Sequence, residues 1–102
     1  MDYQPRFSER AINDARIIYD QIADHSPERA EKWRRGIFAR IDTLRRLPYR
    51  CPRAVEGGRS GKDVRELLYG KRMSTYRVLF VVQDDVVTIL AIRRATRGPA
   101  DL

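Results

Sequence analysis

Cysteine, histidine and lysine are scarce in this chain of 102 residues, and long apolar runs are absent. Cys51 is the single cysteine, so an intramolecular disulfide is impossible, and a reducing cytoplasm is the expected location. With His25 as the one histidine, no cluster has the spacing of a zinc site, and no metal or organic cofactor is implied. No run reaches membrane-spanning length and the start lacks the layout of a secretory signal, so we expect a soluble protein without a membrane partner.

Arginine, by contrast, is abundant. The chain carries 21 Lys and Arg residues against 14 Asp and Glu, a net charge of +7, and only three of the 21 are lysine. The planar guanidinium pairs bidentately with phosphate and carboxylate, so this balance favours an anionic partner such as nucleic acid or an acidic protein segment. Codon usage in a GC-rich genome is an alternative explanation of the preference for arginine over lysine, but it explains the excess of positive charge less well.

The first half of the chain has helical periodicity. After a short edge strand at YQPRF, Ser8 can cap one helix, and Ser26 followed by Pro27 begins a second, which Pro48 ends. We therefore predict a helical hairpin over about residues 8–47. Its first apolar stripe comprises Ala11, Ala15, Ile18 and Ile22, widened by Ile12 and Tyr19, and its second comprises Ala30, Trp33, Ile37, Ile41 and Leu44.

The second half has the period of strands. Residues 48–63, rich in proline and glycine, predict a surface loop. Beyond it VRELLY, TYRVLFVV and VVTILAIRR predict three strands in an antiparallel meander. Both faces of TYRVLFVV are apolar except at Arg77, and one face must bury the helices. The sequence thus predicts one α+β domain over residues 1–102, in which an N-terminal strand and a two-helix hairpin pack on a small antiparallel β-sheet.

This order of elements resembles the RelE/ParE superfamily of bacterial toxins. The matching pieces cover nearly the whole chain: FSERA, SPERAEKW, LRRLPYRCP, VRELLYGKRMSTYRVLFVV and VVTILAIRRATRG. The resemblance implies a growth-inhibiting, plasmid-stabilising toxin of a type II toxin–antitoxin system, bound and neutralised by a cognate antitoxin in a hetero-oligomer. An acidic antitoxin segment that is disordered until bound would suit a partner of charge +7.

Two activities occur in this superfamily. RelE-like members are ribosome-dependent mRNA endonucleases with basic residues on the central strands and a tyrosine near the C-terminus, whereas ParE-like members inhibit DNA gyrase. Arg65 and Arg77 match basic positions of the RelE pattern and Arg94 matches approximately, but Leu67 replaces a lysine and the terminal tyrosine has no counterpart. We therefore predict a ParE-like inhibitor of gyrase. A metal-independent endoribonuclease with Arg65, Arg77 and Arg94 as catalytic residues is the alternative.

The candidate binding residues are Arg93 and Arg97, which with Arg94 form a basic patch near the C-terminus, and Tyr69, the one tyrosine that could stand in as a general acid. The three arginines also have a simpler interpretation, since a run of charged residues is most often just solvated. Arg65 and Arg77 could converge on a phosphate, or could pair with local carboxylates. Those carboxylates are Glu66, Asp84 and Asp85.

Overall fold

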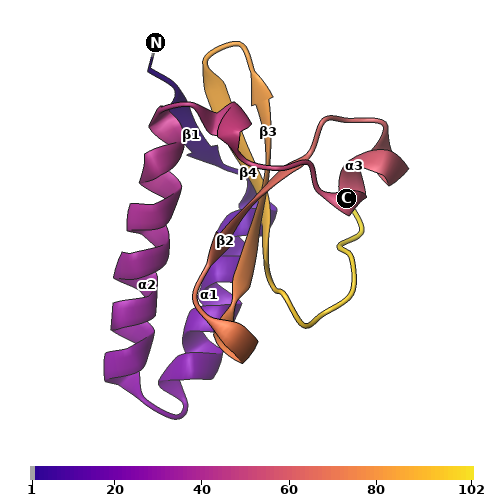
Figure 1. The fold of residues 1–102 in the computed structure, drawn as a ribbon. Coiled ribbons are helices and arrows are strands. Elements are labelled where there is room, and N and C mark those ends of the chain that lie inside the picture. The colour runs from indigo at the N-terminus through magenta and orange to yellow at the C-terminus, as the bar shows by residue number, and fades with distance from the viewer. Residues whose placement is uncertain (1) are drawn as a thin grey trace.

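The fold is a four-stranded sheet with two long helices on one face and a short helix on the other (Figure 1). The structure is a computed structural model that describes residues 2–102. The elements are β1 (Gln4–Phe7), α1 (Glu9–Ala23), α2 (Pro27–Asp42), α3 (Val55–Ser60), β2 (Arg65–Tyr69), β3 (Tyr76–Gln83) and β4 (Val86–Arg94), with single 3₁₀ turns at Thr43–Arg45, Pro48–Arg50 and Arg72–Ser74. The α+β prediction is confirmed.

The strand order is β1-β4-β3-β2. Strands β2, β3 and β4 form the predicted antiparallel meander, but β1 pairs with β4 in parallel, so the sheet is mixed rather than purely antiparallel. Along the chain, the two helices connect β1 to the meander, and they cross one face of the sheet. Strand β3 pairs with one edge of β4, and β1 pairs with the other. Pro5 lacks an N–H group and stands on the edge strand, where a missing donor is tolerated.

The helical hairpin forms as predicted. The Ser8 side chain accepts a hydrogen bond from the Ala11 N–H at 3.1 Å, and the Ser26 side chain accepts one from Arg29 at 3.2 Å, so both helices have N-caps. All five apolar positions predicted for the second helix are buried. On α1 the stripe is narrower than predicted, because Ile12 is 57 % exposed.

The main core lies between the hairpin and the sheet. Phe80, Val78 and Ile89 are fully buried there, and Trp33 of α2 stacks edge-on against Tyr76 with ring centroids 5.4 Å apart. The members that share this core are Ala11, Ala15, Ile18, Trp33, Ile37, Ile41, Leu44, Cys51, Leu67, Tyr76, Val78, Phe80, Val87, Ile89 and Ile92. Trp33 is thus a core residue, as its place on the stripe predicts.

The opposite face of the sheet is covered as well, which corrects the prediction of a plain loop over residues 48–63. That segment contains a 3₁₀ turn and the helix α3, which ends at Gly61 in the left-handed conformation with φ of 72°. Together with the C-terminal segment, residues 95–102, it lies over the outer face (Figure 1). A second apolar cluster results, made of Ala54, Val64, Leu79, Ala91 and Ala100. The apolar outer face of β3 and β4 needs such a cover.

Within residues 2–102, no helix combines the length and the apolar character that crossing a membrane requires.

Candidate functional site

Arg77 lies in a buried cluster of charges on the outer face of the sheet. Its Nη1 and Nη2 donate to the two carboxylate oxygens of Glu56 in α3 at 2.9 and 2.7 Å, and Nη2 also donates to Glu66 Oε1 at 3.0 Å. The backbone N–H of Ala100 donates to Glu56 Oε2 at 2.9 Å. One carboxylate therefore ties together β3, α3 and the C-terminal segment.

The electrostatics of this cluster favour the charged forms. Glu56 is 1 % exposed, yet the Arg77 guanidinium lowers the pKa of its carboxyl to about 2, against the opposing effect of burial and with help from the Ala100 N–H. The same pairing raises the pKa of Arg77. Arg77 is thus already engaged by two carboxylates, one of which, Glu66, is among the partners that the sequence suggests. Reasoning from the sequence does not find Glu56, because it predicts a loop where the structure has α3.

Arg65 has a different environment at the edge of β2. Its Nη1 donates to the carbonyl oxygens of Tyr49 at 3.2 Å and Cys51 at 2.8 Å, and its Nη2 lies 3.2 Å from Asp63 Oδ2. The guanidinium also sits 5.0 Å from the centroid of the Tyr49 ring. Arg65 therefore fastens residues 49–51 to the sheet.

The three arginines of the endonuclease alternative do not meet. Arg65 pairs in register with Phe80, and Arg77 pairs with Leu68, so alternation along the strands places these two arginines on opposite faces. Arg94 pairs with Tyr76 and lies, like Arg65, on the face of the sheet that the helices cover. Arg65 and Arg94 nevertheless stand at opposite ends of the paired strands β2 and β3. No single substrate phosphate could contact all three in this arrangement.

The proposed binding residues, in contrast, do come together, in two adjoining clefts at the end of β4. The smaller cleft, of about 380 Å³, is lined by Asp14, Ile17, Ile18, Gln21, Ile92, Arg93, Arg94 and Arg97. The larger, of about 710 Å³, lies where the tip of the hairpin faces the β2–β3 connection and is lined by Gln21, Ile22, His25, Arg29, Lys32, Trp33, Tyr69, Gly70, Lys71, Ser74, Tyr76 and Arg94. The two clefts share Gln21 and Arg94, and we call them together the basic cleft.

The basic cleft contains three further cations, Arg29, Lys32 and Lys71, which reasoning from the sequence missed because they lie far apart along the chain. Its one lining carboxylate within residues 2–102 is that of Asp14, which accepts a hydrogen bond from the Ile92 N–H at 3.0 Å. The charge of the cleft is therefore strongly positive.

Two lining side chains of the basic cleft are held in place. The guanidinium of Arg94 lies 5.5 Å from the centroid of the Tyr76 ring. The ring of Tyr69 packs over α2 at Gly36, where an added Cβ would stand 1.8 Å from the Tyr69 hydroxyl oxygen. Glycine at position 36 thus allows the close approach that sets one wall of the cleft.

A separate groove runs between α1 and α2 and is mostly apolar. Its volume is about 320 Å³, and it is lined by Ile12, Ala15, Arg16, Tyr19, Trp33, Arg34 and Phe38. Ile12 and Phe38 are 57 % and 36 % exposed, and Phe38 stacks edge-on against Phe7 of β1 at 5.4 Å. Among residues 2–102, no three His, Cys, Asp or Glu side chains gather closely enough to hold a metal ion.

Comparison with known proteins identifies relatives of this fold. The sequence model for the ParE toxin of the type II toxin–antitoxin system parDE matches residues 6–99. A solved chain from P. aeruginosa, described as a chromosomal ParDE TA system, superimposes with a TM-score of 0.73 at 24 % sequence identity, over 90 % of this chain and 95 % of that one. No curated protein matches the chain.

Proposed function

The chain belongs to the ParE toxin family of type II toxin–antitoxin systems, and from this we propose that it inhibits bacterial growth by acting on DNA gyrase in the cytoplasm and that a cognate antitoxin neutralises it. The observation that carries the proposal is the family match over residues 6–99. In a plasmid-borne operon such a pair would stabilise the plasmid, because cells that lose it lose the protecting antitoxin.

The placement of the arginines supports a protein-directed inhibitor over a nuclease. Cleavage of RNA requires cations gathered at one phosphate together with a group that accepts a proton. Arg77 is occupied by Glu56 and Glu66, and Arg65 is held by backbone carbonyls on the other face of the sheet. These two arginines maintain the fold.

The apolar groove is the surface that we assign to the antitoxin. Exposed apolar side chains between two helices favour a partner that brings apolar side chains of its own. Arg16 and Arg34 border the groove, so acidic residues flanking that apolar segment would be attracted. The toxin and antitoxin would then form a hetero-oligomer.

The experiment that tests the activity is induction of the protein in bacteria without an antitoxin, followed by DNA supercoiling and mRNA 5′ ends in the same culture. Relaxed or broken DNA with intact mRNA is the expected result, and purified gyrase should lose supercoiling activity when the protein is added. Codon-positioned mRNA cuts with normal supercoiling would contradict the proposal and establish the endonuclease.

The choice of variant for this experiment follows from the structure. Loss of activity in Arg77→Ala would report the collapse of a buried ion pair, whatever the chemistry. Arg94→Gln is the better probe of the nuclease alternative, because Arg94 makes no salt bridge within residues 2–102. If mRNA cuts occur and vanish in Arg94→Gln, the arginine acts in cleavage.

A further inference from the structure

The basic cleft collects cations that have no carboxylate partner. Among residues 2–102, seven salt bridges form within 4.0 Å, and none of them involves a cation of the basic cleft. Those cations are Arg29, Lys32, Lys71, Arg93, Arg94 and Arg97. Elsewhere on the hairpin, Arg10 and Arg34 each lie within reach of a carboxylate one helical turn away. Nine further Lys and Arg side chains among residues 2–102 form no salt bridge either, so what distinguishes these six is that they line one concave surface.

The distribution of these cations suits an elongated anion. Arg94 and Gln21 belong to both clefts, so the lining is continuous from the tip of the hairpin to Arg97 near the C-terminus. A series of cations along one continuous depression matches a series of regularly spaced negative charges better than it matches a single ion. Both a nucleic-acid strand and an acidic peptide have such a series.

The rest of the lining favours a nucleic-acid strand. Tyr69 brings a partly exposed aromatic ring to the larger cleft, and the polar side chains of Ser74, Gln21 and His25 line the same walls as the cations, whereas Tyr76 and Trp33 are buried beneath. Cations that follow a phosphate backbone, beside an aromatic ring on which a base can stack, are typical of sites for single strands. A duplex is bound instead by elements that project into its grooves, whereas this surface is hollow.

We propose that the basic cleft binds single-stranded nucleic acid, with Arg29, Lys32 and Lys71 contacting phosphates in the larger cleft and Arg94 and Arg97 contacting them in the smaller. This goes beyond the proposed function, because neither gyrase inhibition nor binding of an antitoxin requires the toxin itself to hold a nucleic acid. A toxin with this site would contact strands that its target enzyme exposes.

The test is fluorescence anisotropy of a labelled oligothymidylate of about twelve nucleotides, titrated with the purified protein over a range of salt concentrations. For single strands, each phosphate contact contributes about 0.7 to the slope of log affinity against log salt. The double variant Lys32→Gln/Lys71→Gln should bind several-fold more weakly, with a slope smaller by about 1.4. Both lysines are exposed, so the fold should tolerate the change, and a thermal melt checks this.

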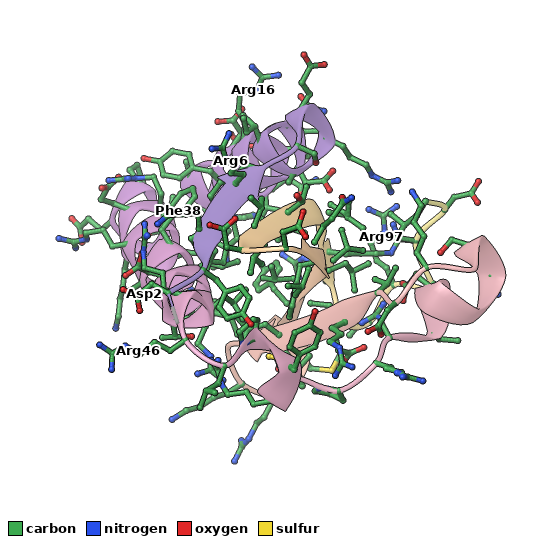
Figure 2. All side chains as sticks on the ribbon, turned by 90° about the horizontal axis from the view of Figure 1, so that it is seen from above. Asp2, Arg6, Arg16, Phe38, Arg46 and Arg97 are labelled. Carbon is green, nitrogen blue, oxygen red and sulfur yellow. The ribbon has the colours of Figure 1, made fainter. Side chains whose placement is uncertain are left out.

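A control variant with the same change in net charge is Arg6→Gln/Arg46→Gln. Arg6 is on the edge strand β1 and Arg46 follows the far end of α2, and Figure 2 shows both well away from Arg97. This variant should keep the affinity and the salt slope of the unmodified protein. An equal loss of affinity in both double variants would mean that net charge alone attracts the oligonucleotide, and it would overturn the proposal.

Two competitors complete the experiment. Unlabelled duplex of the same length should compete poorly, and poly-glutamate should compete less well than unlabelled oligothymidylate. Absence of oligonucleotide binding at low salt, or stronger competition by poly-glutamate, would overturn the proposal, and the second result would assign the cleft to an acidic peptide. Because gyrase is absent from the assay, these results are independent of the proposed activity.

Discussion

The guanidinium of Arg77 and the carboxylate of Glu56 face each other in a two-point hydrogen-bonded pair, with N···O distances of 2.9 and 2.7 Å, beneath the C-terminal segment. Glu56 also receives the N–H of Ala100, so the pair joins a central strand to the two segments that cover the outer face. A charge pair with this degree of burial is costly to form and more costly to break, because the partner left behind remains desolvated.

We first predict that Glu56→Ala destabilises the protein strongly. Removing one partner of a buried ion pair costs about 3–5 kcal/mol, and here the Ala100 N–H loses its acceptor as well. Urea denaturation followed by circular dichroism would measure the loss. The matched control is Asp42→Ala, which removes an ion pair with Arg45 that is exposed on the surface and should change the midpoint little. Equal losses in the two variants would contradict the structural role of Glu56.

The second prediction concerns acid. The pKa of Glu56 is lowered from 4.5 to about 2 by Arg77, so its carboxylate contributes stability that is complete above about pH 4.5 and is lost as the pH falls toward 2. A shift of that size corresponds to about 3 kcal/mol. Unmodified protein and Glu56→Gln should therefore differ most near neutral pH, and the difference should shrink on acidification to about pH 2. A difference that does not change with pH would show that the pair contributes through packing alone.

The pair also shows where reasoning from the sequence succeeded and where it failed. The helices and the meander could be predicted, because each has a clear apolar period and recognisable ends such as Ser8 and Ser26. The helix α3 could not, since VEGGRS has two glycines and too few residues to show a period. The need for a partner at Arg77 was visible as an arginine on an apolar strand, but the identity of Glu56 depended on the unpredicted helix.

The candidate site was predictable to a similar extent. Arg93, Arg94 and Arg97 lie close together in sequence, so their patch was visible. Arg29, Lys32 and Lys71 meet them only because the tip of the hairpin folds against the β2–β3 connection. The opposite placement of Arg65 and Arg77 follows from the strand register, in which Arg65 pairs with Phe80 and Arg77 with Leu68. That register depends on the turn between the strands, and the separation of the two arginines was not foreseen.

The third prediction tests the wall of the basic cleft. A Cβ at position 36 would stand 1.8 Å from the Tyr69 hydroxyl oxygen, so Gly36→Ala must displace the Tyr69 ring, and we expect a cost of about 1–3 kcal/mol. In a Tyr69→Ala background the conflict disappears, and the same substitution should be neutral or stabilising, because alanine favours a helix over glycine. A double-mutant cycle in urea measures this coupling.

A matched control for that cycle is Gly58→Ala in α3, where an added Cβ meets nothing within 4 Å. It should not destabilise the protein, with or without Tyr69. If Gly36→Ala is as well tolerated as Gly58→Ala, or if its cost is the same in the Tyr69→Ala background, the contact between Gly36 and Tyr69 does not limit the packing of α2 on the sheet.

The fourth prediction tests whether the apolar groove is the surface that the antitoxin binds. Ile12 is 57 % exposed in the apolar groove, so Ile12→Gln should leave the fold intact, within about 0.5 kcal/mol, while weakening antitoxin binding. Cells that express the variant with the antitoxin should then be poorly protected, although toxicity without the antitoxin is unchanged. The binding itself can be measured by titrating the purified antitoxin.

The chain offers a close control for this variant on the same helix. Ile17 is 46 % exposed and lies outside the groove, on the wall of the smaller cleft, so Ile17→Gln removes a similar apolar surface from a different place. Protection by the antitoxin should survive Ile17→Gln and fail in Ile12→Gln. The reverse pattern would assign the antitoxin to the basic cleft, where its acidic residues would occupy the cations that we assign to nucleic acid, and the groove would then have no role in neutralisation.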